Sequence, residues 1–263
     1  MALSVLTLLA GYFSTGFLWG KIVEDLGGPT LATFVSVRLF MVANLGRYVP
    51  GKIWQIAGLA ILAKDKGVPP ATSIAAAVVG QGLAIVAASL LGLASGWTLI
   101  EGTVWQWVVP MALFCALLLG LLPSVFRAVS SLCFRLARTP EPEGLEPLVA
   151  LRWFIVTLGS WMLFAGSFWI LVRGLGLEAG LIPTASAFAA AYVLGYVMVF
   201  APAGIGVREG FLIVLLSPQL GPAASGAVAV IARVWTTLTE IVPAAAFWTH
   251  HLTTAQGAHK PRD

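Results

Sequence analysis

Long apolar runs separated by short polar breaks dominate the pattern of residues along this chain. Five of these runs have span length and carry at most two charged residues each; they cover 2–20, 71–96, 104–122, 148–173 and 222–249. A transmembrane helix needs about 20 consecutive apolar residues, so the pattern predicts five full crossings of a membrane. The strands of a membrane barrel alternate apolar and polar residues in runs of about 10, which these continuous runs do not.

Three further apolar segments are too short or too broken for ordinary spans, namely 30–46, 53–63 and 210–217. Runs of 10–14 apolar residues are typical of re-entrant segments. Pro and Gly separate 30–46 from 53–63, and they also separate the run 181–201 from 210–217. Non-helical backbone at membrane depth is tolerated only inside protein or beside a water-filled cavity. We therefore predict two broken, re-entrant helix hairpins in an all-α, polytopic membrane protein.

Composition supports the membrane assignment. The 263 residues are 59% hydrophobic and 10% charged, and the mean hydropathy is +0.94. A soluble domain averages about 25% charged residues, so soluble globular and disordered proteins are both excluded. The two cysteines form no CxxC pair, and all three histidines lie in the polar tail after 249. We expect no metal site, no cofactor and no disulfide framework.

An internal repeat appears when residue n is compared with residue n+152. The window 50–82 has ten identities in 33 positions without a gap. The matches outside alanine pair Pro50 with Pro202, Ile53 with Ile205, Gly58 with Gly210, Ile61 with Ile213, Pro70 with Pro222, Ser73 with Ser225 and Val78 with Val230. In each copy an apolar helix leads to a Pro/Gly break with a basic residue, a short helix, a second break and a long helix.

The basic residues fall mainly on one side of the five predicted spans. Nine lie on the first side, which are Lys21, Lys64, Lys66, Arg127, Arg135, Arg138, Arg152, Lys260 and Arg262. Arg173 is the single one on the other side, and five more lie within membrane segments. The positive-inside rule makes the first side cytoplasmic. The first hairpin then enters from the cytoplasm and the second from outside, which is an inverted-topology repeat of the kind found in many transporters.

The predicted organisation is a single integral membrane domain over 1–263. Its repeat copies cover about 30–96 and 182–249, and the segment 97–181 joins them and contains a cytoplasmic loop at 139–147. This topology puts Met1 outside. Another span often precedes an outward N-terminus, so an internal start at Met1 is left open.

Seven charged residues lie in the apolar zone or at its breaks, and they are Arg38, Arg47, Lys52, Arg208, Glu209, Arg233 and Glu240. A charge at the centre of a membrane costs about 2.5–3.5 kcal/mol, and seven unpaired ones would cost on the order of 15–25 kcal/mol. They must be paired, hydrated or beside a cavity. Five cations against two anions leave a local charge of +3, which an anion such as a lipid phosphate would complement, and the planar guanidinium suits that role.

The candidate substrate-binding set combines these charges with the breaks. It contains Arg47, Pro50, Gly51, Lys52, Gln81, Gly204, Gly206, Arg208, Glu209, Arg233 and Glu240. Two structural alternatives stay open. Arg208–Glu209 and Arg233–Glu240 could be ion pairs that join helices, and Arg47 and Lys52 could extend to a headgroup interface. Trp54 either lines the cavity or belongs to the core or the interfacial belt.

No catalytic motif is present, since HExxH, GxSxG and Walker A sequences are all missing. Asp occurs only at 25, 65 and 263, so there is no Asp-rich motif of the type that holds Mg²⁺ on a diphosphate. We therefore predict a protein that is not an enzyme and has no catalytic residues. An intramembrane enzyme acting on a lipid phosphate is a third reading, which turnover of a lipid would favour.

Both breaks resemble the motifs of one family. Residues 47–54, Arg-Tyr-Val-Pro-Gly-Lys-Ile-Trp, are similar to its R-Y-x-P-G-K-x-W form, and residues 202–209, Pro-Ala-Gly-Ile-Gly-Val-Arg-Glu, to its P-x-G-G/I-G-V-R-E form. This is the transmembrane, flippase-domain family of lysylphosphatidylglycerol synthases, here as a stand-alone member without the synthase domain. Arg233 matches the basic position that the family often has after the second motif. The counterpart in the first copy is commonly acidic, but here it is Gln81.

The resemblance implies a multi-span protein of the bacterial inner membrane that moves or handles a lipid with a charged headgroup. The leading hypothesis is a flippase or transporter for a phospholipid or polyprenyl-linked lipid with an anionic or phosphate-containing headgroup. The alternative is a non-transporting subunit that presents a lipid-linked substrate to a glycosyltransferase or aminoacyl-transferase partner. Nucleic acid is not an expected partner, and a synthase partner and a homo-oligomer are left open.

Overall fold

The computed structural model describes residues 1–49, 53–104, 108, 111, 131, 146–198 and 204–257, and within them it is helical with no strand. The elements are α1 (Ala2–Asp25), α2 (Thr33–Asn44), the 3₁₀ helix η1 (Leu45–Tyr48), α3 (Trp54–Lys64), α4 (Pro70–Ile100), α7 (Pro147–Gly174), α8 (Leu181–Val197) and α9 (Val207–Gly257). The all-α class predicted from the sequence is confirmed.

Four helical stretches are long and apolar enough to cross a membrane. They are α1, Pro70–Leu93 of α4, α7 and Val207–Phe247 of α9. They coincide with four of the five predicted spans. The fifth, 104–122, lies almost wholly outside the described residues, as does the loop 139–147. In lipid, a helix satisfies all of its backbone hydrogen bonds internally, so these apolar stretches form helices. The chain is a multi-pass membrane protein.

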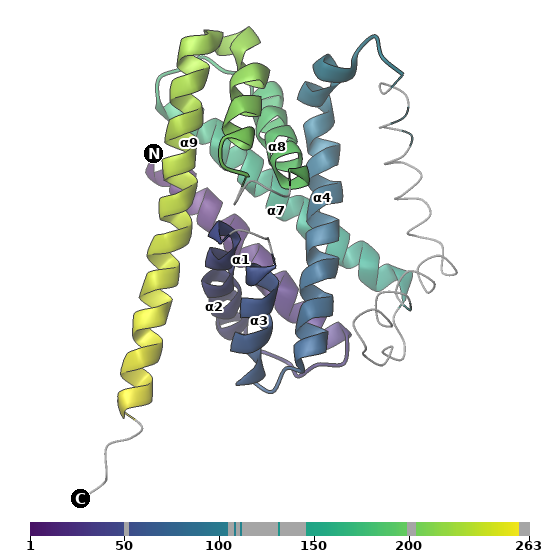
Figure 1. Cartoon of the computed structure of the whole chain (residues 1–263), viewed down its shortest axis with the longest axis vertical. Coiled ribbons are helices and arrows are strands. Elements are labelled where there is room, and N and C mark those ends of the chain that lie inside the picture. The colour runs from purple at the N-terminus through teal and green to yellow at the C-terminus, as the bar shows by residue number, and fades with distance from the viewer. Residues whose placement is uncertain are drawn as a thin grey trace, which may run out of the picture.

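The shorter helices form two hairpins. In each hairpin a non-helical break separates the first helix from the second. The first hairpin consists of α2 with η1 and then α3, and the second consists of α8 and then the start of α9. The first part of α9 ends at Gly221, whose φ of 77° and ψ of 159° are non-helical. Figure 1 shows the light-green start of α9 rising to the top of the molecule and the yellow remainder descending.

The short helix after the second break is longer than the apolar run 210–217 suggests. The sequence pattern ends this segment at Pro218, but the helix passes through that proline and stops at Gly221. Glycine adopts a positive φ at little cost, and a helix cannot continue through that conformation. The glycine therefore ends the segment, and Pro222 begins the final long helix with a φ suited to a first helical turn.

The two hairpins occupy opposite halves of the molecule. In Figure 1, α2 and α3 lie in the lower half, and α8 and the start of α9 lie in the upper half. The order of a long helix, two short helices and a long helix occurs twice, first as α1 to α4 and then as α7, α8 and the two parts of α9. This recurrence agrees with the predicted inverted repeat and adds α1 and α7 to it. The repeat itself stays a prediction.

The helices α1 and α7 pack along each other in antiparallel fashion. At one end Asp25 of α1 accepts hydrogen bonds from Arg152 at 2.8 Å and from the Trp153 indole at 2.7 Å. At the other end the backbone of Gly174 lies against Met1. This pair runs obliquely through the molecule in Figure 1, so it contacts both hairpins.

Each long terminal helix packs on the hairpin of the other half. The helix α4 lies along α8 so closely that a Cβ on Gly92 would come within 2.8 Å of the Ala190 nitrogen. Correspondingly, α9 packs on α2, where Phe34 and Phe247 meet edge to face with ring centroids 5.3 Å apart. This exchange brings the ends of both hairpins against α4 and α9, which is where the candidate site lies.

Orientation in the membrane gives the first testable prediction. Lys64 ends α3 and Lys66 follows it, at the end of the molecule where Arg152 binds Asp25, whereas Arg173 and Glu178 pair at the other end. We expect cysteines replacing Lys66 and Glu178 to react with an impermeant thiol reagent from the cytoplasmic and outer sides, respectively. Labelling of intact and of permeabilised cells, with Cys115 and Cys133 replaced by Ser, measures this, because the cytoplasmic cysteine should react only after permeabilisation. The reverse pattern would overturn the assigned topology.

Candidate functional site

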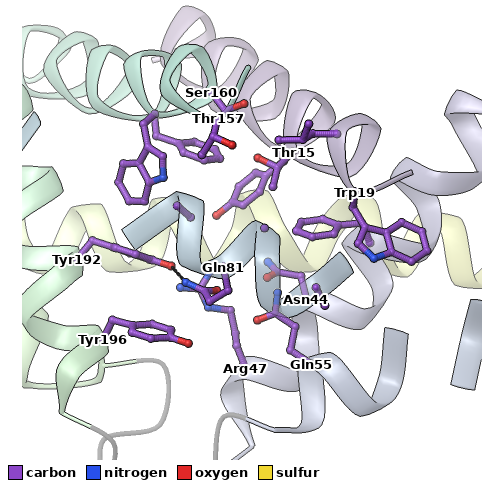
Figure 2. Close-up of a pocket in the computed structure, with 18 of the residues that line it drawn as sticks. Thr15, Trp19, Asn44, Arg47, Gln55, Gln81, Thr157, Ser160, Tyr192 and Tyr196 are labelled. Atoms are coloured by element: carbon purple, nitrogen blue, oxygen red, sulfur yellow. Dashed lines mark hydrogen bonds between the residues drawn. The ribbon is translucent and has the colours of Figure 1, made fainter. Parts of the chain in front are cut away.

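A cavity of about 160 Å³ lies where the two hairpins meet α1, α4 and α7. One water needs roughly 10–15 Å³ by the same measure, so the space is many times larger than a trapped water molecule requires. Its walls are mixed. Figure 2 labels nine of the polar side chains that line it, together with Trp19; the nine are Thr15, Asn44, Arg47, Gln55, Gln81, Thr157, Ser160, Tyr192 and Tyr196. Tyr12, Arg208 and Thr236 line it as well. A cavity of this kind inside the apolar bundle is where non-helical backbone is tolerated.

Residues on both sides of both breaks line this one cavity. Asn44, Arg47 and Gln55 flank the first break. Tyr196, Gly204 and Arg208 flank the second. Described residues beside both breaks thus line one cavity, while Pro50, Gly51 and Lys52 of the candidate set lie outside the described residues.

Gly204 is required at the second break by its geometry. Its φ is 70°, and an added Cβ would lie 3.3 Å from the carbonyl oxygen of Gly195. A side chain would be strained there by the positive φ alone. The close approach keeps the end of α8 against the start of α9, which points Arg208 into the cavity.

Glu240 of α9 is the centre of a buried cluster that joins the two halves. Its side chain is 4% exposed. The Tyr12 hydroxyl and the Arg47 guanidinium both donate to Oε1, the latter at 2.9 Å, and the Tyr48 hydroxyl donates to Oε2 at 2.7 Å. Both carboxylate oxygens are thus satisfied by donors from α1 and η1. The charge of Arg47 is also favoured by its place at the C-terminal end of a helix.

Arg208 is the contrasting cation. Its side chain lies in the cavity wall and is 9% exposed. Its guanidinium carbon lies 4.6 Å from the ring centroid of Phe188, and no carboxylate among the described residues is within ion-pair distance. It also lies in the first turn of α9, where the helix dipole disfavours a positive charge. Of the arginines Arg47, Arg208 and Arg233, Arg208 is the one without an ion-pair partner among the described residues.

A second charged cluster lies just outside the cavity wall. Glu209 Oε2 accepts a hydrogen bond from the Gly206 backbone at 2.6 Å, which caps the first turn of α9. Its other oxygen lies 3.6 Å from Arg233, whose guanidinium carbon is 5.6 Å from the Tyr48 ring centroid. Gly206 itself is exposed. These three candidate residues therefore hold the start of α9 to its second half.

The ion pairs that sequence spacing suggested were wrong, because the structure gives each of these charged residues a different partner or none. Arg208–Glu209 and Arg233–Glu240 were the alternatives, but the structure pairs Arg47 with Glu240 and Arg233 with Glu209. Neighbours along one helix point in different directions or lie too far apart, whereas the reversal at Gly221 brings the start of α9 alongside its second half. Trp54 is 50% exposed and does not line the cavity, so the interpretation as a cavity residue was also wrong.

Gln81 is the candidate residue from α4, and it joins a polar group that the sequence pattern did not reveal. Its amide donates to the Tyr192 hydroxyl at 3.2 Å, and the Tyr192 and Tyr196 rings stack with centroids 6.1 Å apart. Figure 2 shows Arg47 beside Gln81, with Asn44 and Gln55 close by. Tyr12, Tyr48, Asn44, Gln55 and Tyr192 are the site residues that sequence reasoning missed. The available signal was a polar group inside an apolar helix for Tyr12 and Tyr192, and closeness to the first break for the other three.

The described residues that line or adjoin the cavity carry a net positive charge. Arg47 and Glu240 cancel each other, Arg233 and Glu209 cancel each other, and Arg208 remains. Among the described residues no group of His, Cys, Asp and Glu could hold a metal ion. The arrangement can bind an anion through a guanidinium, the amides of Asn44 and Gln55 and the tyrosine hydroxyls. The apolar part of the walls suits a hydrocarbon chain.

A comparison with known protein families identifies the family of this chain. The family model described as the lysylphosphatidylglycerol synthase TM region matches residues 1–244. The chain belongs to this family. No curated protein and no solved structure matches it. The match to the lysylphosphatidylglycerol synthase TM family includes both breaks and every described helix as far as residue 244, so the resemblance predicted from the two motifs is confirmed. Membership makes this a membrane protein of a lipid-related family with a flippase-type domain.

Proposed function

We propose that this protein is a flippase or transporter of the bacterial inner membrane for a lipid with an anionic or phosphate-containing headgroup. The observation that carries the proposal is Arg208, a buried cation without a counter-ion in the described chain, in the wall of a cavity shared by both breaks. An unpaired buried charge is costly, and a lipid phosphate would supply the missing anion through two parallel hydrogen bonds.

The shape of the fold supports movement of the lipid rather than its storage alone. Two hairpins that enter from opposite sides around one central site are typical of alternating access in inverted-repeat transporters. Rocking of one half against the other would expose the headgroup to each leaflet in turn. The contacts that such a motion would have to break and remake are those between the halves, at Glu240 and at Gly92.

The protein acts in this proposal without chemistry of its own. The match to the TM region of the synthases, a flippase-type domain, supports this part of the proposal. A phospholipid or a polyprenyl-linked lipid would fit the cavity charge equally, so the lipid class is defined by its phosphate. Presentation of the lipid to a glycosyltransferase or aminoacyl-transferase is the alternative role for the same site.

Two measurements on the purified full chain test the proposal. Native mass spectrometry of the protein extracted from membranes should identify a co-purified lipid that carries phosphate. In liposomes, the protein should then exchange a fluorescent analogue of that lipid between leaflets faster than protein-free liposomes do and faster than the Arg208→Gln variant does. Binding without exchange would reject transport in favour of the presenting role, and the absence of any bound phospholipid would reject both.

A further inference from the structure

Trp19 of α1 carries a buried hydrogen-bond donor in the cavity wall. Its side chain is 3% exposed and lines the cavity. The indole N–H has no acceptor in the described part of the chain. A buried donor that is left unpaired costs its full desolvation penalty. An oxygen atom of a bound molecule would supply the missing acceptor and remove that cost.

Two amide side chains lie in the wall on the same side of the cavity, Asn44 at the end of α2 and Gln55 in the first turn of α3. Figure 2 shows the nitrogen of the Trp19 indole on the ring edge that is turned toward them, and it shows no hydrogen bond from either amide to another residue drawn. Each amide has a carbonyl that accepts and an NH₂ that donates. A hydroxyl group also does both, whereas an ester carbonyl only accepts. These three side chains therefore match a group that carries hydroxyls.

The charge of the wall limits which headgroups fit. Arg47 and Arg208 are the only charged residues among the described ones that line the cavity. Glu240 does not line it, and both of its oxygens already accept hydrogen bonds from Tyr12, Arg47 and Tyr48. An ammonium group in the cavity would meet two cations and no carboxylate, and such like-charge contacts reduce affinity. The wall therefore suits a headgroup that is uncharged beyond its phosphate.

We propose that Trp19, Asn44 and Gln55 form a subsite for the hydroxyl groups of an uncharged polyol or sugar headgroup, on the lipid whose phosphate Arg208 binds. This inference rests on the proposed function and narrows its substrate class. The subsite comes from α1, α2 and α3, and Arg208 comes from α9, so one headgroup contacts both halves of the chain. A site built to pair a hydroxyl rejects an analogue without it, because the polar groups of the site are then left unpaired.

Binding of matched lipids to the purified full chain in an uncharged detergent tests the subsite. Phosphatidylglycerol should bind about tenfold more tightly than phosphatidylpropanol, whose three-carbon headgroup lacks the hydroxyls. Phosphatidylethanolamine should also bind about tenfold more weakly than phosphatidylglycerol, because its ammonium meets no carboxylate. Equal affinities for phosphatidylglycerol and phosphatidylpropanol would overturn the proposal, and so would phosphatidylethanolamine binding as tightly as phosphatidylglycerol.

Trp19→Phe keeps an aromatic ring but removes the N–H. It should weaken phosphatidylglycerol binding about fivefold and leave the affinity for phosphatidylpropanol unchanged. Trp235→Phe is the matched control, since that indole is 8% exposed and also lacks an acceptor among the described residues but does not line the cavity. Its affinities for both lipids should equal those of the wild type. An equal loss for both lipids in Trp19→Phe would assign Trp19 to packing and overturn its role as a donor.

Gln55→Met gives a second test that does not depend on the folding of Trp19→Phe. Methionine keeps the length of the side chain without the amide, so the preference for phosphatidylglycerol over phosphatidylpropanol should shrink. An unchanged preference would remove Gln55 from the subsite and contradict the proposal as stated.

Two comparisons separate the possible failures. The diether analogue of phosphatidylglycerol lacks ester carbonyls and should bind as the diester does; a loss of affinity would assign the Trp19 acceptor to an ester and overturn the headgroup assignment. Arg208→Gln should weaken the binding of phosphatidylglycerol and phosphatidylpropanol alike. If it does so while the wild type shows no preference between them, only the hydroxyl subsite is overturned. Unchanged binding of both lipids in Arg208→Gln would overturn the proposed function itself.

Discussion

Replacing Arg208 by Gln should weaken the binding of an anionic lipid about 100-fold and should not destabilise the protein. Removing one partner of a desolvated charged pair costs about 2–5 kcal/mol in binding, and 2.7 kcal/mol corresponds to 100-fold. Stability should rise, since the side chain is 9% exposed and no described carboxylate neutralises it. A residue kept for packing would show the opposite result, a loss of stability with little change in lipid affinity.

The measurement combines lipid titration with thermal unfolding of the same samples. Arg208→Lys is the closest control, because it retains the charge but not the planar fork, and its affinity should lie between those of wild type and Gln. Arg38→Gln controls for the loss of a cation from an apolar helix, since Arg38 does not line the cavity. Full lipid affinity in a folded Arg208→Gln protein would refute the binding role.

The features predicted from the sequence are those that depend on local pattern. Apolar runs predicted α1, α4, α7 and the last part of α9, and Pro/Gly breaks predicted both hairpins. The offset of 152 residues predicted that the breaks are equivalent. Arg47 and Arg208 followed from the cost of a charge inside a span. Each of these inferences needs only the local sequence around a residue or, for the repeat, the local sequence around its counterpart 152 positions away.

The features that were missed depend on which helix faces which. Spacing along α9 shows that Arg233 and Glu240 share a face, but the counter-ion of Glu240 comes from η1, 193 residues away in the chain. Tyr12 lies in the middle of a span where aromatic residues are read as core. The role of its hydroxyl as a hydrogen-bond donor becomes visible only when the Glu240 carboxylate on α9 is known to lie beside it. Tertiary contacts of this kind leave no periodic signal.

Breaking the Arg47–Glu240 pair should produce the largest loss of stability. Removing one partner of a buried ion pair costs about 3–5 kcal/mol, because it leaves an uncompensated charge. For a chain of this size that corresponds to a fall of roughly 10 °C in Tm. Both Arg47→Gln and Glu240→Gln should show it. The double variant should be more stable than either single one, since two neutral amides leave no buried charge.

The comparison with an exposed pair sets the scale. Arg152 binds Asp25 at 2.8 Å, but its side chain is 59% exposed, so Arg152→Gln should cost at most about 1 kcal/mol. If the double Arg47/Glu240 variant lost as much stability as the two single variants together, the two residues would act independently. That result would contradict the pair as the main contact between the halves.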